Sequence, residues 1–272
     1  MIIKRLKDFD IQQISDSGQC FRLEKAEENR FQLVAKDKYL EIEQKAEEVQ
    51  FFCSEEEFEE IWKVYFDLET NYGRIKESIE EEDEYLKKAI LCGGGIRILR
   101  QDLWEMIVSF LISQQNNIPR IKKIIRTLCE KYGESRRNFR GKEYFCFPKA
   151  EVIAQLEEKE LMDCNLGYRS KYVMRTAKCI VDGSFSIQNL WEMDYKKAKE
   201  SLKQLYGVGE KVADCICLFG LHQIEAFPID THIKQMLEKH YKKGFPFKKY
   251  QGYAGVLQQY AFYYETYGER KD

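Results

Sequence analysis

The pattern of apolar and polar positions changes character near residue 95. Before residue 53, apolar residues occur in short runs that partly alternate with polar residues, which is typical of strands with one buried face. The sequence Lys36-Asp37-Lys38 suits a hairpin turn between two such runs. An antiparallel sheet is therefore predicted, with strands over residues 19–23, 31–35, 39–43 and 49–52.

A helix is predicted directly after these strands. Ser54-Glu55-Glu56-Glu57 is a capping box, and Phe58, Ile61, Trp62 and Tyr65 follow at helical spacing. Further along, Gly93-Gly94-Gly95 is predicted to be the most flexible point of the chain and the start of a helical body. No Gly-Lys-Ser/Thr sequence follows these glycines, which argues against a P-loop that binds nucleotide phosphates.

After residue 95 the apolar residues recur mainly at helical spacing. Residues 103–112 are almost continuously apolar, so this helix should be central, whereas the basic segment 136–144 is expected to be a loop. Further helices are predicted over residues 121–132, 148–161, 231–240 and 253–262. One more helix is predicted to end at residue 181. We predict an α+β fold, mainly α, with a small N-terminal antiparallel sheet domain and flanking helices (1–95) before an all-helical domain (96–272).

Gly207-Val208-Gly209 interrupts two helical patterns. Ala198, Leu202 and Leu205 precede the break at helical spacing, and residues 212–219 after it are apolar almost all round. Two glycines around one apolar residue form a tight turn, and the following helix start adds unpaired N–H groups and a positive dipole end. This helix-hairpin-helix, over about residues 198–219, could hold a phosphate without a basic side chain.

Lys211 and Asp230 are the candidate chemical groups. Lys211 lies in the first turn of the second helix, where a lysine is normally unfavourable; a solvated surface lysine is the alternative interpretation. In the segment 227–232, Pro228 imposes an extended backbone and Asp230 can cap the next helix. The short connection could bring the amine and the carboxylate to one cleft.

A run of polar residues follows the central helix. Ser113-Gln114-Gln115-Asn116-Asn117 leads to Ile118-Pro119-Arg120, and Pro119 suits the first turn of the next helix. This could be an ordinary helix connection. It could also be a polar loop held at a fixed position for binding.

Composition narrows the choice of partner. The chain has 272 residues, 44% of them hydrophobic, and no apolar run near the length of a membrane span. Its net charge is −2, but residues 1–100 carry 16 basic and 24 acidic side chains (−8), so residues 101–272 carry +6. A nucleic-acid surface is expected mainly on the second part. The nine cysteines are scattered, which favours free thiols in a reducing, intracellular compartment.

Gly-Val-Gly-Glu-Lys-Val-Ala-Asp-Cys-Ile-Cys-Leu, followed by Pro-Ile-Asp-Thr-His, resembles the helix-hairpin-helix/Gly-Pro-Asp superfamily of DNA glycosylases. More narrowly, the chain from about Ser15 onward resembles the 8-oxoguanine DNA glycosylase family. The resemblance implies a bifunctional enzyme that flips 8-oxoguanine out of duplex DNA, excises it opposite cytosine through a lysine Schiff base, and cleaves the strand by β-elimination. Lys211 would be the nucleophile, its pKa lowered by the helix start and partial burial, and Asp230 would stabilise the positive charge on the sugar.

The resemblance also implies two sets of binding residues. The base pocket would comprise Gly18, Cys215, Phe219, Gln258 and Phe262, with the Gly18 carbonyl accepting the extra N–H of the oxidised base. The DNA contacts would comprise Gln115, Asn116, Asn117, Arg120, Tyr168, Arg169, Gly207, Gly209 and His232. Arg120 and Arg169 would face the orphaned cytosine, and Tyr168 would be a wedge in the base stack.

Alternatives remain at several of these positions. Tyr168 could cap the core, Arg120 could contact only phosphate, and His232 could cap a helix. Cys215 could be a thiol of low pKa or a buried inert one. The family has three asparagines where this chain has Gln114-Gln115-Asn116-Asn117, so the amide that fills the gap is left open.

Cofactors and competing functions can also be addressed from the sequence. Endonuclease III relatives hold an iron–sulfur cluster with four cysteines after the aspartate, but no cysteine follows Cys217 here, so no such cofactor is expected. We expect a monomer that acts on DNA in the nucleoid or nucleus and contacts no membrane. The competing functions are a glycosylase for another damaged purine, and a non-catalytic helix-hairpin-helix DNA-binding protein.

Overall fold

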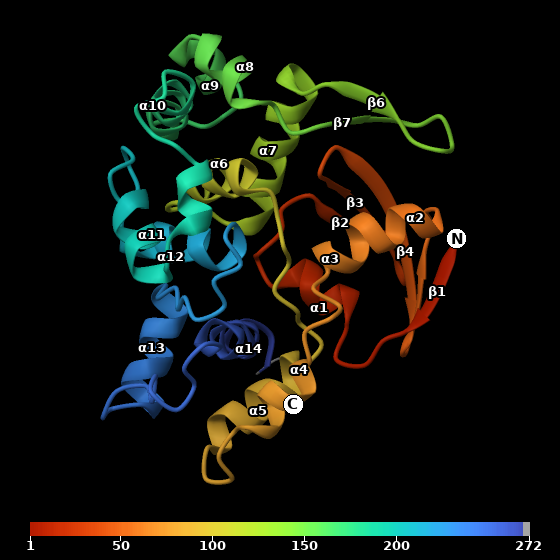
Figure 1. The fold of residues 1–272 in the computed structure, drawn as a ribbon, viewed down its shortest axis with the longest axis vertical. Helices are drawn as coiled ribbons and strands as arrows, with labels where there is room; N and C mark the ends of the chain where they lie inside the picture. The colour runs from red at the N-terminus through yellow and green to blue at the C-terminus, as the bar shows by residue number, and fades with distance from the viewer. Residues whose placement is uncertain (269–272) are drawn as a thin grey trace.

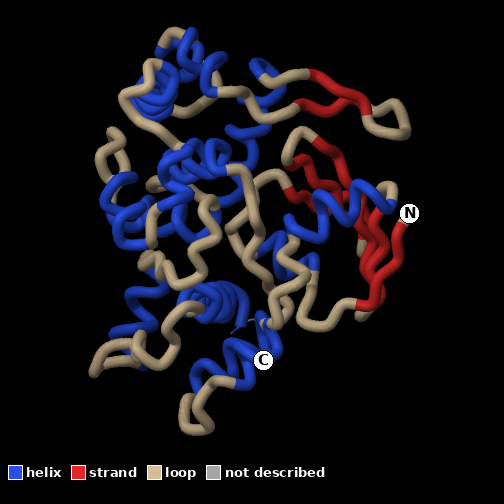
Figure 2. The backbone as a smooth tube through the Cα atoms, in the orientation of Figure 1, coloured by secondary structure: helices blue, strands red, loops and turns tan. Residues whose placement is uncertain are grey.

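The computed structural model describes residues 1–268 as a twisted sheet on one side and a larger helical body on the other (Figures 1 and 2). The sheet is antiparallel, as the sequence predicted, and its strand order is β1-β5-β4-β3-β2. Its strands are β1 (Ile2–Arg5), β2 (Leu23–Glu27), β3 (Arg30–Ala35), β4 (Lys38–Lys45) and β5 (Glu48–Phe51). β1 was not predicted, and β2 begins where the expected first strand was to end.

A short helix lies in the region that was predicted as strands only. In α1 (Ile11–Asp16), the Asp10 side chain accepts a hydrogen bond from the Gln13 amide at 3.0 Å, and Ile11 and Ile14 are buried. Six residues are too few to show a helical period in the sequence, so the strand prediction was wrong here.

The Ser54 half of the predicted capping box begins a helix that covers the sheet domain's core. The Glu57 carboxylate does not complete the box and accepts from Trp62 Nε1 at 2.8 Å instead. The Ser54 hydroxyl accepts from the Glu57 amide at 3.1 Å. The helix runs through α2 (Glu55–Glu57), a π-helical turn (Phe58–Trp62) and α3 (Lys63–Tyr65). Its side chains Phe58, Trp62 and Tyr65 are buried with the sheet, as predicted.

The triple glycine is tightly packed, and its prediction as a flexible point was wrong. The Gly95 amide donates to Gln13 Oε1 and its carbonyl accepts from the Asp10 amide, both at 2.8 Å. A Cβ at Gly95 would lie 2.4 Å from Asp10 Cβ, so only glycine allows this approach. The preceding helices α4 (Tyr72–Glu77) and α5 (Glu84–Gly93) contribute side chains to the helical core, with α5 against α14 (Ala254–Tyr267).

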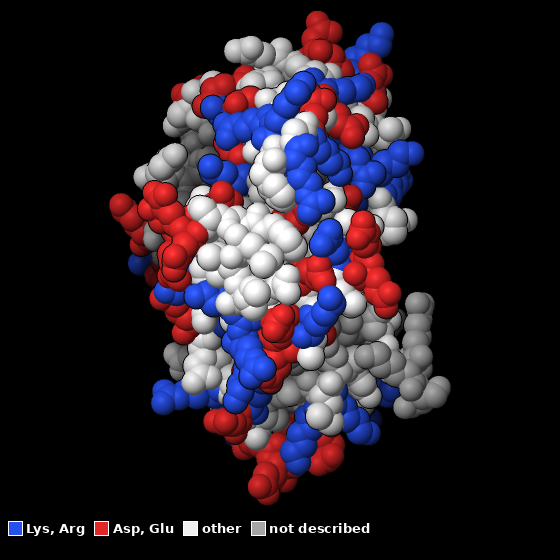
Figure 3. All heavy atoms as spheres, turned by 90° about the vertical axis from the view of Figure 1, so that its right-hand side faces the viewer, with Lys and Arg blue, Asp and Glu red and all other residues white. Residues whose placement is uncertain are grey.

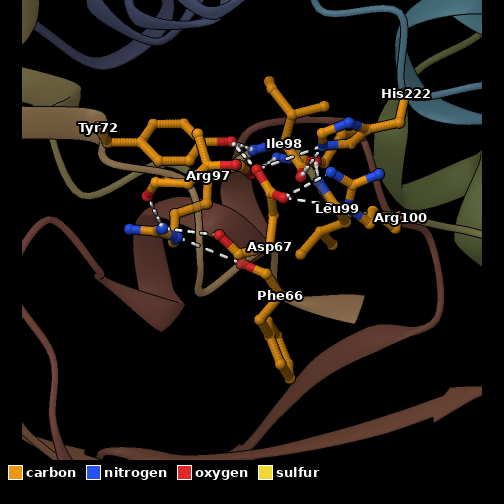
Figure 4. Close-up of polar contacts among 10 residues, drawn as sticks. Phe66, Asp67, Tyr72, Arg97, Ile98, Leu99, Arg100 and His222 are labelled. Atoms are coloured by element: carbon orange, nitrogen blue, oxygen red, sulfur yellow. Dashed lines mark hydrogen bonds and ion pairs between the residues drawn. The ribbon is translucent and has the colours of Figure 1, made fainter. Parts of the chain in front are cut away.

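A buried polar cluster joins the two parts of the molecule (Figure 4). Arg97 is 4% exposed; its guanidinium donates to the Asp67 carbonyl at 2.7 Å and lies 4.2 Å from the Tyr72 ring centre. His222 Nε2 lies 3.3 Å from Asp67 Oδ2 and 3.2 Å from the Ile98 carbonyl oxygen. Because His222 follows helix α12 (Glu210–Phe219), this cluster fixes the end of that helix relative to the sheet domain.

The helical body contains the central helix that the sequence predicted. α6 (Leu103–Ser113) is buried along almost its whole length. The predicted helix over 148–161 is divided into α8 and α9 by an extended Leu156. The helix predicted over 231–240 is present with those bounds, and the helices predicted over 121–132 and 253–262 are present with shifted ends. The remaining helices of the body are α7 (Ile118–Tyr132), α8 (Ala150–Gln155), α9 (Glu158–Met162), α10 (Arg169–Val181), a 3₁₀ turn (Gln188–Glu192), α11 (Tyr195–Leu202) and α13 (Thr231–His240).

The basic segment predicted as a loop is a β-hairpin, which makes the helical body not entirely helical. Its strands are β6 (Ser135–Arg137) and β7 (Glu143–Phe145). The hairpin lies beside the acidic sheet domain, where Arg140 contacts Glu41 at 2.9 Å and the Tyr144 hydroxyl donates to the Asp37 carbonyl at 3.2 Å. Figure 3 views the molecule from the right-hand side of Figure 1 and shows lysine and arginine side chains gathered in the upper part of that face. Three-residue strands depend on such tertiary contacts, which local sequence does not reveal.

Candidate active site

The helix-hairpin-helix turn contains two glycines that the structure uses differently. Gly207 has φ +90°, and a Cβ there would lie 2.5 Å from the Tyr172 ring. Gly209 precedes α12 with φ −99° and ψ −176°, a conformation open to any residue, and a Cβ there would meet nothing within 4 Å. The fold therefore requires Gly207, whereas Gly209 leaves the amides at the start of α12 accessible from an open cleft.

Lys211 is half-buried in the first turn of α12. The adjacent Glu210 is engaged by Lys203 and by Lys199 at 2.9 Å, and these bonds lower the pKa of Glu210 to about 2. Lys211 Nζ lies 5.7 Å from the centre of the Phe110 ring and forms no ion pair within residues 1–268. The neighbouring carboxylate is thus held by other lysines, which leaves this amine available.

Asp230 caps α13, as the sequence predicted. Its Oδ1 accepts from the Ile233 amide at 2.8 Å, and the described chain provides no hydrogen bond for Oδ2. The preceding Pro228 is buried and lines the same narrow pocket as Lys211. Asp230 and Lys211 together line both a narrow pocket of about 60 Å³ and a neighbouring open cleft of about 420 Å³.

The narrow pocket brings together residues from four distant parts of the chain. Each residue predicted for catalysis or base binding lines it: Gly18, Lys211, Cys215, Phe219, Asp230, Gln258 and Phe262. Phe219 stacks on Phe110 with ring centres 5.4 Å apart, and Gln258 Nε2 donates to the Pro228 carbonyl at 3.0 Å. The residues of this lining that the sequence did not predict are Ser17, Phe110, Pro228 and Gln259. For Gln259, the signal was a second amide beside Gln258 in an apolar helix.

The Cys215 thiol is not activated. Burial raises its pKa to about 11, although the nearby Lys211 acts to lower it. This direction favours the interpretation of a buried, inert thiol at this position.

Comparison with known proteins agrees with this geometry. Residues 1–107 match the family model "8-oxoguanine DNA glycosylase, N-terminal domain", and residues 108–244 match "HhH-GPD superfamily base excision DNA repair protein". The chain belongs to the 8-oxoguanine DNA glycosylase family. The 8-oxoguanine glycosylase/lyase of Clostridium acetobutylicum, solved with DNA containing cytosine opposite 8-oxoG, is 36% identical with a TM-score of 0.91, covering 99% of both chains.

Two further relatives support this membership. The MBOgg1 structure, solved with a low-affinity DNA ligand, is 36% identical with a TM-score of 0.92, covering 98% of this chain and 96% of that one. The N-glycosylase/DNA lyase of Saccharomyces cerevisiae is 35% identical over 165 residues, covering 57% of this chain and 44% of that protein. The chain thus spans less than half the length of this curated relative.

In this 8-oxoguanine glycosylase family member, the polar loop after α6 contains one side-chain amide, that of Gln115, without a hydrogen bond to the described residues. Asn117 Oδ1 accepts from the Arg120 amide at 3.0 Å, and Asn116 Nδ2 donates to the Ile112 carbonyl at 3.2 Å. Gln114 Nε2 donates to the Gly207 carbonyl at 3.0 Å and ties the loop to the helix-hairpin-helix turn. Gln115 is exposed, with φ +48°, and its side chain makes no hydrogen bond to the described chain.

The buried Arg169 side chain holds the backbone of this loop through hydrogen bonds. It is 3% exposed; its Nε donates to the Gln114 carbonyl at 2.8 Å and its Nη2 to the Gln115 carbonyl at 3.0 Å. The adjacent Tyr168 is 47% exposed, so it does not cap the core, and the Arg169 guanidinium lies 4.5 Å from its ring centre. The Arg169 guanidinium thus contacts the loop backbone, and its contact with an orphaned base stays a prediction.

Arg120 and His232 are both exposed, in the first turns of α7 and α13. The His232 ring lies edge-on to Phe262, with centres 6.1 Å apart, and Asp230 rather than His232 caps α13. Within residues 1–268, no group of three or more histidine, cysteine or acidic side chains could hold a metal ion. No helix in the same range is long and apolar enough to cross a membrane.

Proposed function

We propose that this protein excises 8-oxoguanine, paired opposite cytosine, from duplex DNA and then cleaves the strand at the abasic site. The observation that carries the proposal is the position of Lys211 and Asp230, which line both the narrow pocket and the open cleft beside it. The names of the similar proteins, glycosylase/lyase and N-glycosylase/DNA lyase, support the same two activities. We further propose that the enzyme acts as a monomer without a cofactor, in the compartment that holds DNA.

The cleft provides anchors for a duplex with one nucleotide extruded. The turn at Gly207 and Gly209 would bind a backbone phosphate through the free amides of α12. Extrusion costs a few kcal/mol, which is offset when protein groups replace the lost base. Gln115 is our candidate for filling the gap because its neighbours' amides are already engaged, and exposed Tyr168 would be the wedge beside it.

Lys211 would supply the nucleophile. Its free amine forms a bond to the anomeric carbon of the sugar as the bond to the base breaks, and the base leaves with the bonding electron pair. The positive charge that develops on the sugar would be stabilised by Asp230, whose Oδ2 is not used in capping. Ring opening gives an iminium on Lys211, which makes the adjacent sugar proton acidic, so the 3′ phosphate leaves by β-elimination.

The pocket would recognise the oxidised base. Gly18 has φ +73° and lines the pocket beside Phe262, where its carbonyl could accept the N–H that oxidation adds to guanine. Phe262 and Phe219 provide aromatic walls, and Gln258 provides an amide. At about 60 Å³ the pocket is smaller than the roughly 300 Å³ of common ligand sites, so we expect half-buried Phe262 to move when a base enters.

A borohydride-trapping experiment tests the proposal. With DNA carrying one 8-oxoguanine opposite cytosine, the wild-type protein should form a covalent adduct and Lys211→Gln should not. Asp230→Asn should bind the same DNA but react at least about 10²-fold more slowly. Lys234→Gln, an exposed lysine on α13, is the matched control and should be trapped normally. Undiminished trapping of Lys211→Gln would refute the assignment of the nucleophile.

The two competing functions predict different results in the same assay. A non-catalytic DNA-binding protein needs neither Lys211 nor Asp230, so wild-type protein would bind but form no adduct. A glycosylase for another damaged purine would process that base faster than 8-oxoguanine. A panel of duplexes that differ only in the damaged base separates these cases.

A further inference from the structure

One face of α10 is basic, exposed and not used in the proposed mechanism. The helix Arg169–Val181 contains four basic residues and no acidic one. Arg169 is buried, but Lys171, Arg175 and Lys178 are exposed, and their spacing of four and three residues places them on one face. None of these three side chains forms an ion pair within residues 1–268. Like charges at this spacing repel one another, so the face is a candidate for binding an anionic partner.

A row of tyrosine rings places this basic face beside the helix-hairpin-helix turn. The Tyr172 ring on α10 meets the Tyr206 ring edge-on with centres 5.3 Å apart, and it meets the Tyr168 ring in the same way at 5.6 Å. Tyr206 directly precedes Gly207 of the turn and is 50% exposed. The Arg175 guanidinium lies over the Tyr206 ring, 4.2 Å from its centre. The basic face is therefore one side chain away from the turn that is proposed to bind a phosphate.

The contact with Tyr206 positions Arg175 without using its N–H groups. A guanidinium over an aromatic ring is held by the ring face, whereas its five N–H groups point outward in the guanidinium plane and can still donate. Phosphate oxygens are acceptors that match this geometry. Other cations near the turn are already neutralised, since Lys199 and Lys203 both contact Glu210. Free positive charge on this side of the turn is thus provided by α10.

We infer that Lys171, Arg175 and Lys178 (the α10 surface) form a second phosphate-binding surface, which continues from the turn along the backbone of the same duplex. This inference rests on the proposed function for its partner, duplex DNA. The helix rises about 10 Å from Lys171 to Lys178, and successive phosphates of one strand rise about 3.4 Å each. The α10 surface therefore has the reach of about three phosphates. Because phosphate contacts carry no sequence information, it should add affinity equally for damaged and undamaged DNA.

The experiment measures how DNA affinity depends on salt, by fluorescence anisotropy with an undamaged duplex and with one that carries a stable abasic-site analogue. Each phosphate contact contributes about −0.9 to the slope of log K against log salt concentration. Arg175→Gln should therefore make the slope less steep by about 0.9 on both duplexes, and its combination with Lys171→Gln and Lys178→Gln should change the slope by up to about 2.7. Arg74→Gln is the matched control and should keep the wild-type slope. It removes one exposed charge from α4, which lies far from α10 in Figure 1.

Variants of Tyr206 test whether this ring positions Arg175. Tyr206→Leu should make the slope less steep, whereas Tyr206→Phe keeps the ring and should keep the wild-type slope. Because the two residues act through one contact, Tyr206→Leu combined with Arg175→Gln should lose no more than Arg175→Gln alone. Additive losses would overturn the positioning role of Tyr206.

The outcomes separate this inference from the proposed function. Wild-type protein that binds both duplexes but excises no 8-oxoguanine would refute the proposed function and leave this inference standing. A wild-type slope in the triple variant would overturn the inference and would leave the α10 surface to an acidic protein partner. Equal changes in Arg175→Gln and Arg74→Gln would also overturn it, because net charge alone would then explain them. A less steep slope that appears only together with a lowered thermal midpoint would indicate a role in folding, which contradicts the inference as well.

Discussion

Substitution by alanine should have different effects at the two glycines of the helix-hairpin-helix turn. At Gly207 it should lower stability, whereas at Gly209 it should lower DNA affinity. At Gly207 the left-handed backbone costs a side-chain residue about 1–2 kcal/mol. The new Cβ would also lie 2.5 Å from the Tyr172 ring, and such overpacking costs about 1–3 kcal/mol. Gly207→Ala should therefore lower the free energy of unfolding by about 2–5 kcal/mol, a large part of the roughly 5–15 kcal/mol of a typical protein.

Gly209→Ala should fold normally. Its backbone conformation suits alanine, and the new methyl group points into open space. Alanine lowers the entropy of the unfolded chain, which stabilises the folded state by about 0.4–1 kcal/mol. Alanine is also a poorer helix cap than glycine by a similar amount, so the two effects on the free energy of unfolding offset each other. The methyl group would, however, occupy the cleft where a phosphate approaches the α12 amides. Losing one hydrogen bond to a charged group costs about 1.5–3 kcal/mol, so DNA affinity should fall by about 10- to 100-fold.

Thermal unfolding and fluorescence anisotropy with a duplex containing a stable abasic-site analogue measure the two effects. Gly183→Ala is the control for backbone strain, because Gly183 has φ +80° but a Cβ there meets nothing within 4 Å. It should lose about 1–2 kcal/mol of stability and keep its DNA affinity. Wild-type affinity in Gly209→Ala would refute the reasoning that phosphate is bound at this turn.

Three further predictions concern other residues. Arg120→Ala should reduce the preference for cytosine over adenine opposite the lesion by about tenfold, since a good bidentate pair discriminates by about 1–3 kcal/mol; uniform weakening on all four opposite bases would instead indicate a phosphate contact. Arg169→Ala should lower the thermal midpoint and slow excision opposite every base alike, because it removes the support of the loop; selective loss opposite cytosine would contradict this. Burial acts to raise the pKa of Asp67, but His222 and then Arg100 outweigh it, so the pKa lies below its ordinary value. A carboxyl of lowered pKa stabilises the fold above its unfolded pKa, and this contribution is lost as pH falls through the folded pKa. In Asp67→Asn the thermal midpoint should therefore decrease less steeply than in the wild type as pH falls below about 4. The same decrease in the variant and the wild type would contradict this prediction.

The sequence predicted those features that local chemistry determines. The apolar run of α6 required a central position, and the helix-capping aspartate at Asp230 followed from its place after a proline. The hairpin β6–β7 and helix α1 were not predicted, because each is short and depends on contacts with distant segments. The triple glycine was misinterpreted for a related reason: glycine permits both flexibility and close packing, and only the presence of Asp10 against Gly95 decides between them.

The loop at the site shows why residue identity did not predict side-chain direction. Arg169 matches a family position, but a guanidinium at 3% exposure must satisfy its N–H groups, and the carbonyls of Gln114 and Gln115 are the acceptors within reach. Those two bonds hold Gln115 in its left-handed conformation, which places its amide outward, while Asn117 is fixed as a helix cap. We therefore predict that Arg169 acts mainly by fixing the backbone of Gln115, the residue proposed to replace the extruded base.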